Sequence, residues 1–339
     1  MRYNHITRRT ALAAGAVGLA APALIGRAHA AQVTLKLSSS LPDDPKYANG
    51  RVYYDLLLKH LKANDLDQKI AVHFFPNNQL GQEIDIVNQV KLGVVDMMVT
   101  GTSIWANLVP VFGVLDLGYV FQSYPQQTKA LDAGAGKQLE QMLLAGANTR
   151  MVGWAYNFGA RSFFTKFPFT EPDQLAGKKI RSLPNPVITE VVRLMGAAAT
   201  PLAFGEIYTA LQAGVLDGLE HDPPTILASK FYETAKHYVL TEHIYSPLGI
   251  FLSEASFKRM PAALHDPFLD AAGKAAVDER AAGLAVVDEA MNGLKHQGVE
   301  VTDCDRAAFR KRVSPMWDEF AKQHAEAKPI LDQLLNTPA

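Results

Sequence analysis

The sequence predicts an α/β fold of two similar lobes, with a long helix lying along both of them. Three observations lead to this prediction. Strand-like and helix-like segments alternate from residue 33 onward, which is the order of elements in an α/β sheet covered by helices. A corner made of a helix, a glycine and a strand occurs twice, at Gly93 and at Gly214. An alanine-rich stretch beginning at Phe268 could run as a helix for about 25 residues, or roughly 38 Å.

The first thirty residues have the pattern of an export signal. Arg8 and Arg9 precede an apolar stretch, Ala11 to Ile25, and the segment ends in Ala-His-Ala. The apolar stretch is shorter than the ~20 residues that a membrane-spanning helix needs, and this order of charged, apolar and small residues is typical of a cleaved signal. The paired arginines favour export by the twin-arginine (Tat) route. We therefore expect residues 1–30 to be removed and the mature protein to lie in a bacterial periplasm.

The remaining elements can be placed in order along the chain. Runs of β-branched and aromatic residues predict strands, and apolar residues at helical spacing predict helices. We expect strands at 33–38, 69–75, 94–101, 150–157, 178–182 and 215–220, and helices at 47–64, 83–93 and 206–214. The apolar segment 97–121 is interrupted by Asn107, Pro110 and Asp116. It is therefore expected to be a buried strand with a loop, and not a membrane span.

The two glycine corners share more than the glycine. Each has an isoleucine seven residues before the glycine, and each continues into two aliphatic residues and an aspartate, Asp96 or Asp217. Glycine readily adopts the left-handed conformation that ends a helix. The repeat supports two related lobes with a cleft between them. We place them at residues 31–157 with about 247–285, and at residues 158–246 with about 286–339.

Composition limits the classes of function. Removal of the first thirty residues takes away four arginines and no acidic residue, so the formal net charge changes from −1 to −5. An acidic chain without basic runs argues against nucleic acid as a partner. Cys304 is the only cysteine, so neither an intrachain disulfide nor a cysteine-based metal site can form. The phosphate-binding, nucleophile-elbow and zinc motifs are missing, and we expect a monomer without a cofactor.

Two arginines and one acidic cluster are candidates for a binding site. Arg161 and Arg181 each accompany a predicted strand, and a guanidinium offers parallel donors that match a carboxylate. Glu220, His221 and Asp222 follow one another at the end of another strand. Consecutive strand residues point to opposite faces, so only Glu220 and Asp222 could share a cation, with Glu242 or His243 as further ligands. His221 and Asp222 could also form an acid/base pair, and both alternatives stay open.

Three segments resemble a known family in order and spacing: "FFPNNQLGQE", "GARSFFTKFPFTEPDQLAGKKIRS" and "TPLAFGEIYTALQAGVLDGLEHDPP". The family is that of the TRAP transporter periplasmic solute-binding proteins, the DctP type, and the similarity covers essentially the whole mature chain. It implies an α/β, two-lobed periplasmic binding protein fold with a hinge and a long C-terminal spine helix. It also implies that a small organic acid is bound between the lobes and delivered to membrane-embedded permease subunits.

The resemblance further implies which residues contact the ligand. Arg181 matches the arginine that forms a bidentate salt bridge with the ligand carboxylate, and Arg161 matches a second arginine beside it. Asn185 is expected to complete the carboxylate contacts, and Phe204 to pack against the carbon skeleton. The first lobe is expected to contribute Ser39, Thr102, Ser103 and Trp105. Gln79 and Glu83 also fit a family motif, but their position before a helix indicates an N-terminal capping role as readily as ligand contact, so they are left out of the site. Glu206 and Tyr208 are expected to be structural.

The chain departs from its relatives after Glu220. Many members have an amide-bearing residue there, whereas this sequence has His221 and then Asp222. A carboxylate facing the cleft would repel a second ligand carboxylate and accept hydrogen bonds from hydroxyls. We therefore expect a hydroxylated monocarboxylate, such as a sugar acid or hydroxy acid. The alternatives are a periplasmic enzyme acting on an organic acid, metal-assisted binding of a keto acid, and a receptor that presents its ligand to a sensor kinase.

Overall fold

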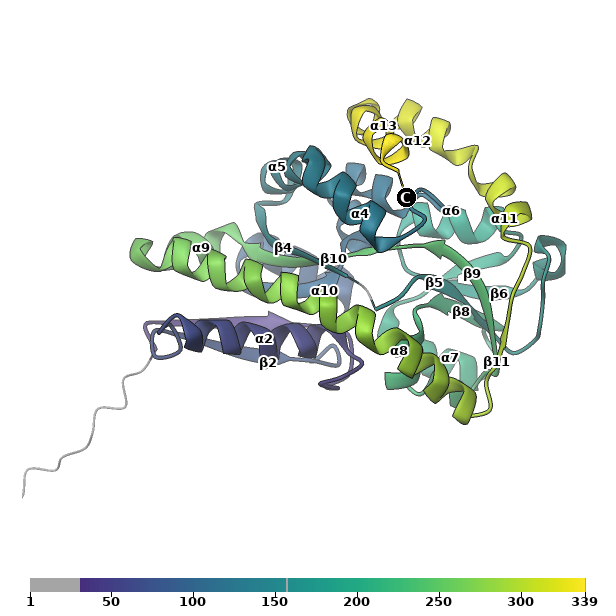
Figure 1. Cartoon of the computed structure of the whole chain (residues 1–339), viewed down its shortest axis with the longest axis horizontal. Helices are drawn as coiled ribbons and strands as arrows, with labels where there is room; N and C mark the ends of the chain where they lie inside the picture. The colour runs from purple at the N-terminus through teal and green to yellow at the C-terminus, as the bar shows by residue number, and fades with distance from the viewer. Residues whose placement is uncertain (1–30, 157, 339) are drawn as a thin grey trace, which may run out of the picture.

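The computed structural model describes residues 31–156 and 158–338. The predicted export signal lies outside this part of the chain. The described residues form two β-sheets with helices packed around them, and one long helix, α10 (His265–His296), runs across the molecule past both (Figure 1). This is a mixed α/β fold with two sheets and a long C-terminal helix, as the sequence predicts.

The first sheet has the strand order β2-β1-β3-β10-β4. β1 pairs in parallel with β2 and β3, whereas β10 runs antiparallel to both of its neighbours. β2 lies at one edge of the sheet, whereas β3 lies inside it and is almost wholly buried, as a strand covered on both faces must be. The strands of this sheet are β1 (Val33–Ser38), β2 (Ile70–Phe75), β3 (Met97–Gly101), β4 (Thr149–Tyr156) and β10 (Pro247–Ser253).

The second sheet has the strand order β11-β9-β5-β8-β6-β7. β6 pairs in parallel with β7 and β8, and β5 runs antiparallel to β8 and β9. Its strands are β5 (Arg161–Thr165), β6 (Lys179–Ser182), β7 (Ala198–Pro201), β8 (Gly218–His221), β9 (His237–Ile244) and β11 (Glu300–Thr302). The arrangement of β6, β7 and β8 repeats that of β1, β2 and β3 in the first sheet.

Helices follow the strands in the order that an α/β chain requires. Before α10 they are α2 (Asn49–Ala63), α3 (Glu83–Leu92), α4 (Tyr124–Ala130), α5 (Gly136–Ala147), α6 (Pro186–Leu194), α7 (Ile207–Gln212), α8 (Pro223–Ala228) and α9 (Glu254–Arg259). After α10 they are α11 (Arg306–Val313), α12 (Met316–Gln323) and α13 (Lys328–Asn336). These last helices lie along the upper side of the molecule in Figure 1, where α13 contacts α4.

The two glycine corners have the same geometry. Gly93 follows α3 with a φ of 75°, and Gly214 follows α7 with a φ of 73°, a left-handed conformation that a residue with a Cβ rarely adopts. The aspartate after each corner also has the same role. Asp96 accepts a hydrogen bond from the backbone N–H of Lys36 at 2.8 Å, and Asp217 accepts one from Lys179 at 2.8 Å. Each carboxylate thereby ties its corner to the neighbouring parallel strand.

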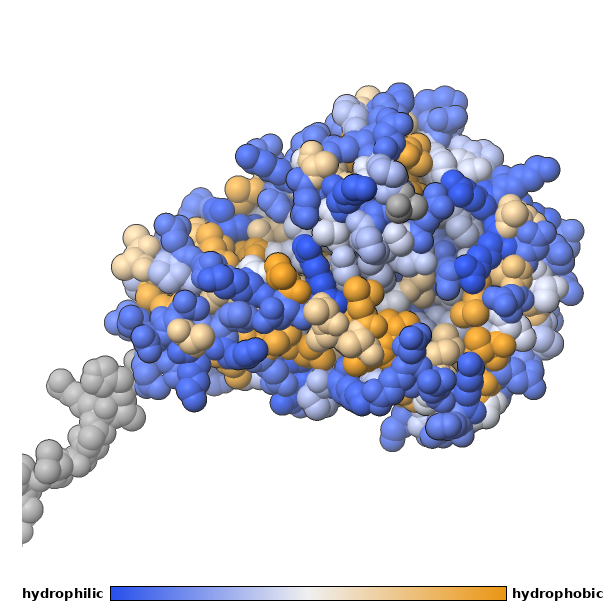
Figure 2. Space-filling view, viewed as in Figure 1, coloured by the Kyte–Doolittle hydropathy of each residue, from blue (hydrophilic) through white to orange (hydrophobic). Residues whose placement is uncertain are grey.

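The long helix is longer than the sequence analysis expected. It has 32 residues and begins at His265, because Pro267 lies in the first turn, where no backbone N–H donor is needed. Its internal glycines allow close packing: a Cβ on Gly283 would lie 2.3 Å from a ring carbon of Phe158. Apolar side chains lie exposed along this helix, among them Val277 and Leu284, within a mostly hydrophilic face (Figure 2).

The apolar segment 97–121 is interior structure. It forms β3 and two 3-10 helices, η1 (Thr102–Asn107) and η2 (Pro110–Asp116), and most of its residues are buried. Within residues 31–156 and 158–338, none of the helices has the length and apolar character needed to cross a membrane.

A carboxyl group is buried where α10 crosses the end of β4. Glu279 has no exposed surface, and one of its oxygens accepts a hydrogen bond from the backbone N–H of Tyr156 at 3.1 Å. Its other oxygen has no hydrogen-bond partner among the described residues. Burial raises the pKa of Glu279 well above its usual value of 4.5, because a carboxylate loses its hydration here.

The raised pKa makes Glu279 a source of pH-dependent stability. Above pH 4.5 the unfolded chain releases this proton and the folded protein retains it, so ionisation favours unfolding as the pH rises. We expect Glu279→Gln to gain unfolding free energy relative to the wild type by about 1.4 kcal/mol per pH unit above pH 4.5, up to the folded pKa. Urea unfolding between pH 5 and pH 8 measures this difference. Asp288→Asn, an exposed carboxylate on the same helix, is the control; parallel profiles for all three proteins would contradict the expectation.

Candidate ligand-binding cleft

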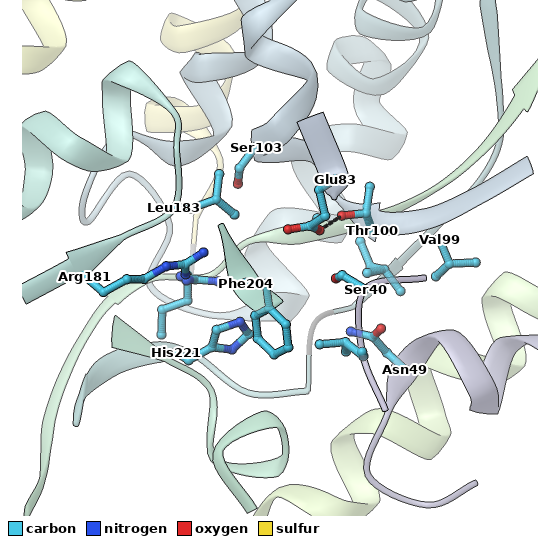
Figure 3. A pocket seen from close by; sticks show the side chains of 14 residues that line it. Ser40, Asn49, Glu83, Val99, Thr100, Ser103, Arg181, Leu183, Phe204 and His221 are labelled. Carbon is cyan, nitrogen blue, oxygen red and sulfur yellow. Dashed lines mark hydrogen bonds between the residues drawn. The ribbon is translucent and has the colours of Figure 1, made fainter. Parts of the chain in front are cut away.

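A cavity lies between the two sheets, where the carboxyl ends of their parallel strands face each other. This is where ligands bind in α/β sheets. The space open to the centres of water molecules is about 30 Å³, enough for two or three waters. Residues of the first sheet and its helices that line the cavity are Ser40, Leu41, Asn49, Glu83, Val99, Thr100, Gly101, Ser103 and Leu248; those of the second are Arg161, Arg181, Leu183, Phe204 and His221 (Figure 3).

Arg181 supplies free donors to this cavity. It lies on β6, is fully buried, and its Nε donates to the carbonyl of Leu202 at 2.8 Å. Both terminal guanidinium nitrogens, Nη1 and Nη2, have no hydrogen-bond partner among the described residues. Burial lowers the pKa of Arg181 to about 10, so the group still carries its charge at neutral pH. A buried cation with two free parallel donors fits a carboxylate ligand.

Arg161 lies in the same cavity but already has a carboxylate partner. Its Nε and Nη2 both donate to the side chain of Glu220 on β8, the second at 2.7 Å, and Nη2 also donates to the Glu220 carbonyl at 3.0 Å. His243 on β9 places its Nε2 3.7 Å from the same carboxylate. Burial raises the pKa of Glu220, but Arg161 and His243 outweigh it, so this pKa lies well below its usual range.

Acceptor groups line the wall opposite Arg181. Glu83 begins α3 and extends into the cavity, where its carboxylate accepts a hydrogen bond from the Thr100 hydroxyl at 2.5 Å (Figure 3). The Ser103 hydroxyl donates to the buried carboxylate of Asp116 at 2.5 Å. Burial raises the pKa of Asp116 to about 7, against the opposing effects of Ser103 and Arg161. The Thr100 and Ser103 protons are thus both bound by carboxylates, which leaves the two hydroxyl oxygens as acceptors.

Phe204 and His221 form the remaining side of the cavity. Their rings meet edge to face with centroids 5.7 Å apart. The Nδ1 of His221 lies 2.7 Å from a carboxylate oxygen of Asp222 and 3.1 Å from the Asp222 backbone nitrogen. The carboxylate contact is the shorter of the two and a carboxylate only accepts, so we assign the proton to Nδ1. Burial lowers the pKa of His221, which favours the neutral ring. Its Nε2 is then an acceptor as well.

Asp222 itself does not line the cavity, contrary to expectation. Its carboxylate accepts hydrogen bonds from the Thr225 N–H at 2.9 Å and the Thr225 hydroxyl at 3.1 Å. It is the N-cap of α8, where a side-chain oxygen satisfies a backbone donor that the helix leaves unpaired. Asp222 therefore orients His221 and caps a helix.

Asn185 also has a structural position. Its Oδ1 caps α6 by accepting from the backbone N–H groups of Val187 and Ile188 at 2.7 and 3.0 Å. Its Nδ2 donates to the backbone carbonyl of Ser103 and lies 3.5 Å from the carboxylate of Asp116. Asn185 thus joins the second sheet's helix α6 to the segment that carries Ser103, next to the cavity but not in its lining.

Three expected contacts from the first lobe lie behind the cavity wall. Trp105 is fully buried and stacks on Phe251 with ring centroids 4.5 Å apart. Thr102 is buried, and Ser39 packs against Gly50 of α2, where an added Cβ would lie 2.4 Å from the Ser39 hydroxyl oxygen. Of the first-lobe residues expected to contact a ligand, Ser103 lines the cavity.

Sequence reasoning missed Ser40, Asn49 and Thr100, and it left Glu83 out of the site because helix capping explained its position equally well. In the structure the N-cap of α3 is Gln82, without a side-chain hydrogen bond, so Glu83 is available to the cavity. The position of Glu83 directly after a predicted strand and turn, on the side of the sheet where ligands bind, was the available signal. Gln79 and Glu206 are exposed, and the Tyr208 hydroxyl donates to Glu233 at 2.5 Å.

The metal alternative needs carboxylates with free oxygens. The Glu220 carboxylate is paired with Arg161, and that of Asp222 with Thr225 and His221. Glu242 points elsewhere, to Arg306. Within residues 31–156 and 158–338, no three His, Cys, Asp or Glu side chains converge on one point that could bind a metal ion.

Fold and cavity together define a class of protein: a binding protein that encloses a small anionic solute between two α/β units. The family model named DctP, described as "Bacterial extracellular solute-binding protein, family 7", matches residues 53–323. The chain belongs to this family, and its structural neighbours are TRAP periplasmic solute-binding proteins.

Three relatives illustrate the similarity. A TRAP periplasmic solute-binding protein of Polaromonas sp. JS666, solved with D-erythronate, is 30% identical with a TM-score of 0.84 over 91% of this chain and 99% of its own. One of Chromohalobacter salexigens, solved with D-glucuronate, is 27% identical with a TM-score of 0.84 over 90% and 100%. The C4-dicarboxylate-binding periplasmic protein of Rhodobacter capsulatus is 29% identical over 315 residues, 91% of this chain and 90% of its own.

The two cleft arginines should respond oppositely to substitution. Arg181→Met removes a buried cation with two free donors, so we expect the ligand-free protein to gain about 1–3 kcal/mol of unfolding free energy. Arg161→Met leaves the Glu220 carboxylate buried and unpaired, so we expect a loss of about 3–5 kcal/mol. Urea unfolding of the dialysed proteins measures both. Losses of equal size would show that Arg181 has a stabilising partner, contrary to its geometry.

Proposed function

We propose that this chain binds a hydroxylated monocarboxylate, such as a sugar acid or hydroxy acid, and delivers it to the membrane-embedded permease of a TRAP transporter. The ligand carboxylate pairs with Arg181, and the ligand hydroxyls donate to the opposite wall. The observation that carries this proposal is the buried Arg181 guanidinium, whose Nη1 and Nη2 lack partners among the described residues.

The hydrogen-bonding groups of the cavity favour this ligand class. Donors are concentrated at Arg181, whereas Glu83, Thr100, Ser103 and the Nε2 of His221 present acceptors. A molecule with a carboxylate at one end and several hydroxyl groups satisfies both sets. The two solved relatives named above contain D-erythronate and D-glucuronate, which have this chemistry.

The preference for one carboxylate rests on Glu83. Asp222, on which the sequence-based expectation depended, faces away from the cavity, but Glu83 lines it and its charge acts on Arg181. Two like charges about 4 Å apart repel by roughly 1–4 kcal/mol at effective dielectric constants of about 80 to 20. A second ligand carboxylate on this wall is therefore disfavoured.

The protein acts in this proposal as a monomeric carrier and not as an enzyme. Members of its family bind solutes, and the His221–Asp222 pair orients an acceptor toward the ligand without a nucleophile beside it. The chain needs no cofactor and no nucleic acid for this role. Export by the twin-arginine route, which residues 1–30 suggest, would place it in the periplasm.

A thermal-shift panel tests ligand class and anchor together. We expect D-erythronate, D-gluconate or D-glucuronate to raise the melting temperature, and a ligand at about 100 times its dissociation constant adds ~2.7 kcal/mol of stability. Arg181→Met should abolish the shift, whereas Arg193→Met, an exposed arginine paired with Glu190, should retain it. Recovery of the ligand unchanged after incubation supports binding without turnover. A shift in melting temperature that survives Arg181→Met would refute the assignment of Arg181 as the partner of the ligand carboxylate.

Glu83 should control the choice between one and two carboxylates. We expect Glu83→Gln to lower the ratio of the dissociation constant for a dicarboxylate to that for its monocarboxylate counterpart by about tenfold. Calorimetry with D-glucarate against D-gluconate, and meso-tartrate against D-erythronate, gives this ratio. Glu190→Gln on the exposed side of α6 serves as the control. Tighter binding of the dicarboxylates by the wild type would contradict the proposed class.

A further inference from the structure

Asp116 lies behind the cavity wall and contacts both lobes. It ends η2 and has no exposed surface. One of its carboxylate oxygens accepts the Ser103 hydroxyl at 2.5 Å, and the other lies 3.5 Å from the Nδ2 of Asn185. Asp116 does not line the cavity, but Ser103 does, and Figure 3 shows the Ser103 hydroxyl directed toward the ligand space.

We propose that Asp116 binds the Ser103 proton and thereby makes the Ser103 oxygen an acceptor toward the ligand. The site then selects a ligand hydroxyl over a keto oxygen at that position. A serine hydroxyl has one proton and two acceptor sites. When an ionised carboxylate takes the proton, the oxygen can only accept from the ligand. A hydroxyl donates to it, whereas a keto oxygen would place two acceptors against each other.

Asn185 determines which atom of residue 116 faces Ser103, and so whether the Ser103 hydroxyl donates to residue 116 or accepts from it. Its Oδ1 is committed to the N–H groups of Val187 and Ile188, so its Nδ2 must face Asp116 as a donor. The Asp116 oxygen near Asn185 therefore has to accept. In Asp116→Asn, the new amide must turn its carbonyl to Asn185 and its NH2 group to Ser103. The Ser103 proton is then displaced toward the cavity, and the oxygen that accepted becomes a donor.

This inference rests on the proposed function and names the residue that refines its specificity. Asp116 acts through Ser103 and is a positioning residue. The charged groups around it are Arg161 from β5 and Glu220 from β8, with His243 of β9 beyond Glu220. None of them contacts the Ser103 hydroxyl in the described structure, so the identity of residue 116 controls the direction of this one hydrogen bond.

The test compares a hydroxy acid with its keto partner at pH 8.5, where the Asp116 carboxylate is ionised. Calorimetry with D-gluconate, 2-keto-D-gluconate and 5-keto-D-gluconate, and with D-erythronate and its 2-keto form, gives the ratio of keto to hydroxy dissociation constants. We expect Asp116→Asn to lower this ratio by about 10- to 100-fold for at least one pair. An unchanged ratio in a folded variant overturns the inference.

Two further variants separate the role of Asp116 from a loss of stability. Asp96→Asn alters a buried aspartate that also accepts a serine hydroxyl, Ser256 at 2.6 Å, but far from the cleft, and it should leave the ratio unchanged. Ser103→Ala removes the acceptor and should weaken binding of the hydroxy acid about tenfold, which remains measurable if Asp116→Asn fails to fold. Unchanged affinity in Ser103→Ala overturns the inference. If none of the hydroxy acids binds the wild type, the proposed function itself fails.

Discussion

The ion pair between Arg161 and Glu220 is the interaction on which the cleft depends. Two fully buried charges are stable only because each satisfies the other, with two side-chain hydrogen bonds and one to the Glu220 carbonyl. The pair occupies neighbouring antiparallel strands, β5 and β8, so it also fixes the part of the second sheet that faces the ligand. Once Glu220 is paired with Arg161, the guanidinium of Arg181 is left without a carboxylate among the described residues. The fold thereby keeps a buried cation whose Nη1 and Nη2 have no hydrogen-bond partner among the described residues.

Burial of Arg181 has a second consequence. With no exposed surface on this residue, the carrier role proposed above requires the two sheets to separate before a solute can reach its guanidinium. The long α10 lies along both sheets, and Glu279 hydrogen-bonds to the end of β4. The hydrogen bond from Asn185 Nδ2 to the Ser103 carbonyl joins the two sides of the cavity. In the proposed carrier, a ligand carboxylate paired with Arg181 would remove the cost of an unpaired buried cation.

The specificity of such a site depends on the direction of its hydrogen bonds as much as on its charges. Thr100 and Ser103 each give their proton to a carboxylate, Glu83 or Asp116, and His221 gives its Nδ1 proton to Asp222. Three side chains that could donate or accept are thus made acceptors by anionic neighbours. Asp222 and Asn185 act on the ligand indirectly, although the family resemblance assigns them to direct contact. Both cap helices, and both contact residues that line the cavity, His221 and Ser103.

The sequence by itself determined the α/β class, the repeated corners at Gly93 and Gly214, and the two arginines of the cleft, because periodicity, left-handed glycines and strand-end positions are local properties. It also indicated the long helix, although not that it begins at His265, before Pro267. Both arginines look alike along the chain and both of their strands pair with β8, yet of the two only Arg161 hydrogen-bonds to Glu220. Only the tertiary structure decided that Arg161 is paired and Arg181 is free. It likewise decided that Glu83 enters the cavity while Asp222 caps α8. The pairing of Arg161 and the placement of Glu83 depend on contacts between residues 59 and 17 positions apart, Arg161 with Glu220 and Thr100 with Glu83, which no local pattern encodes.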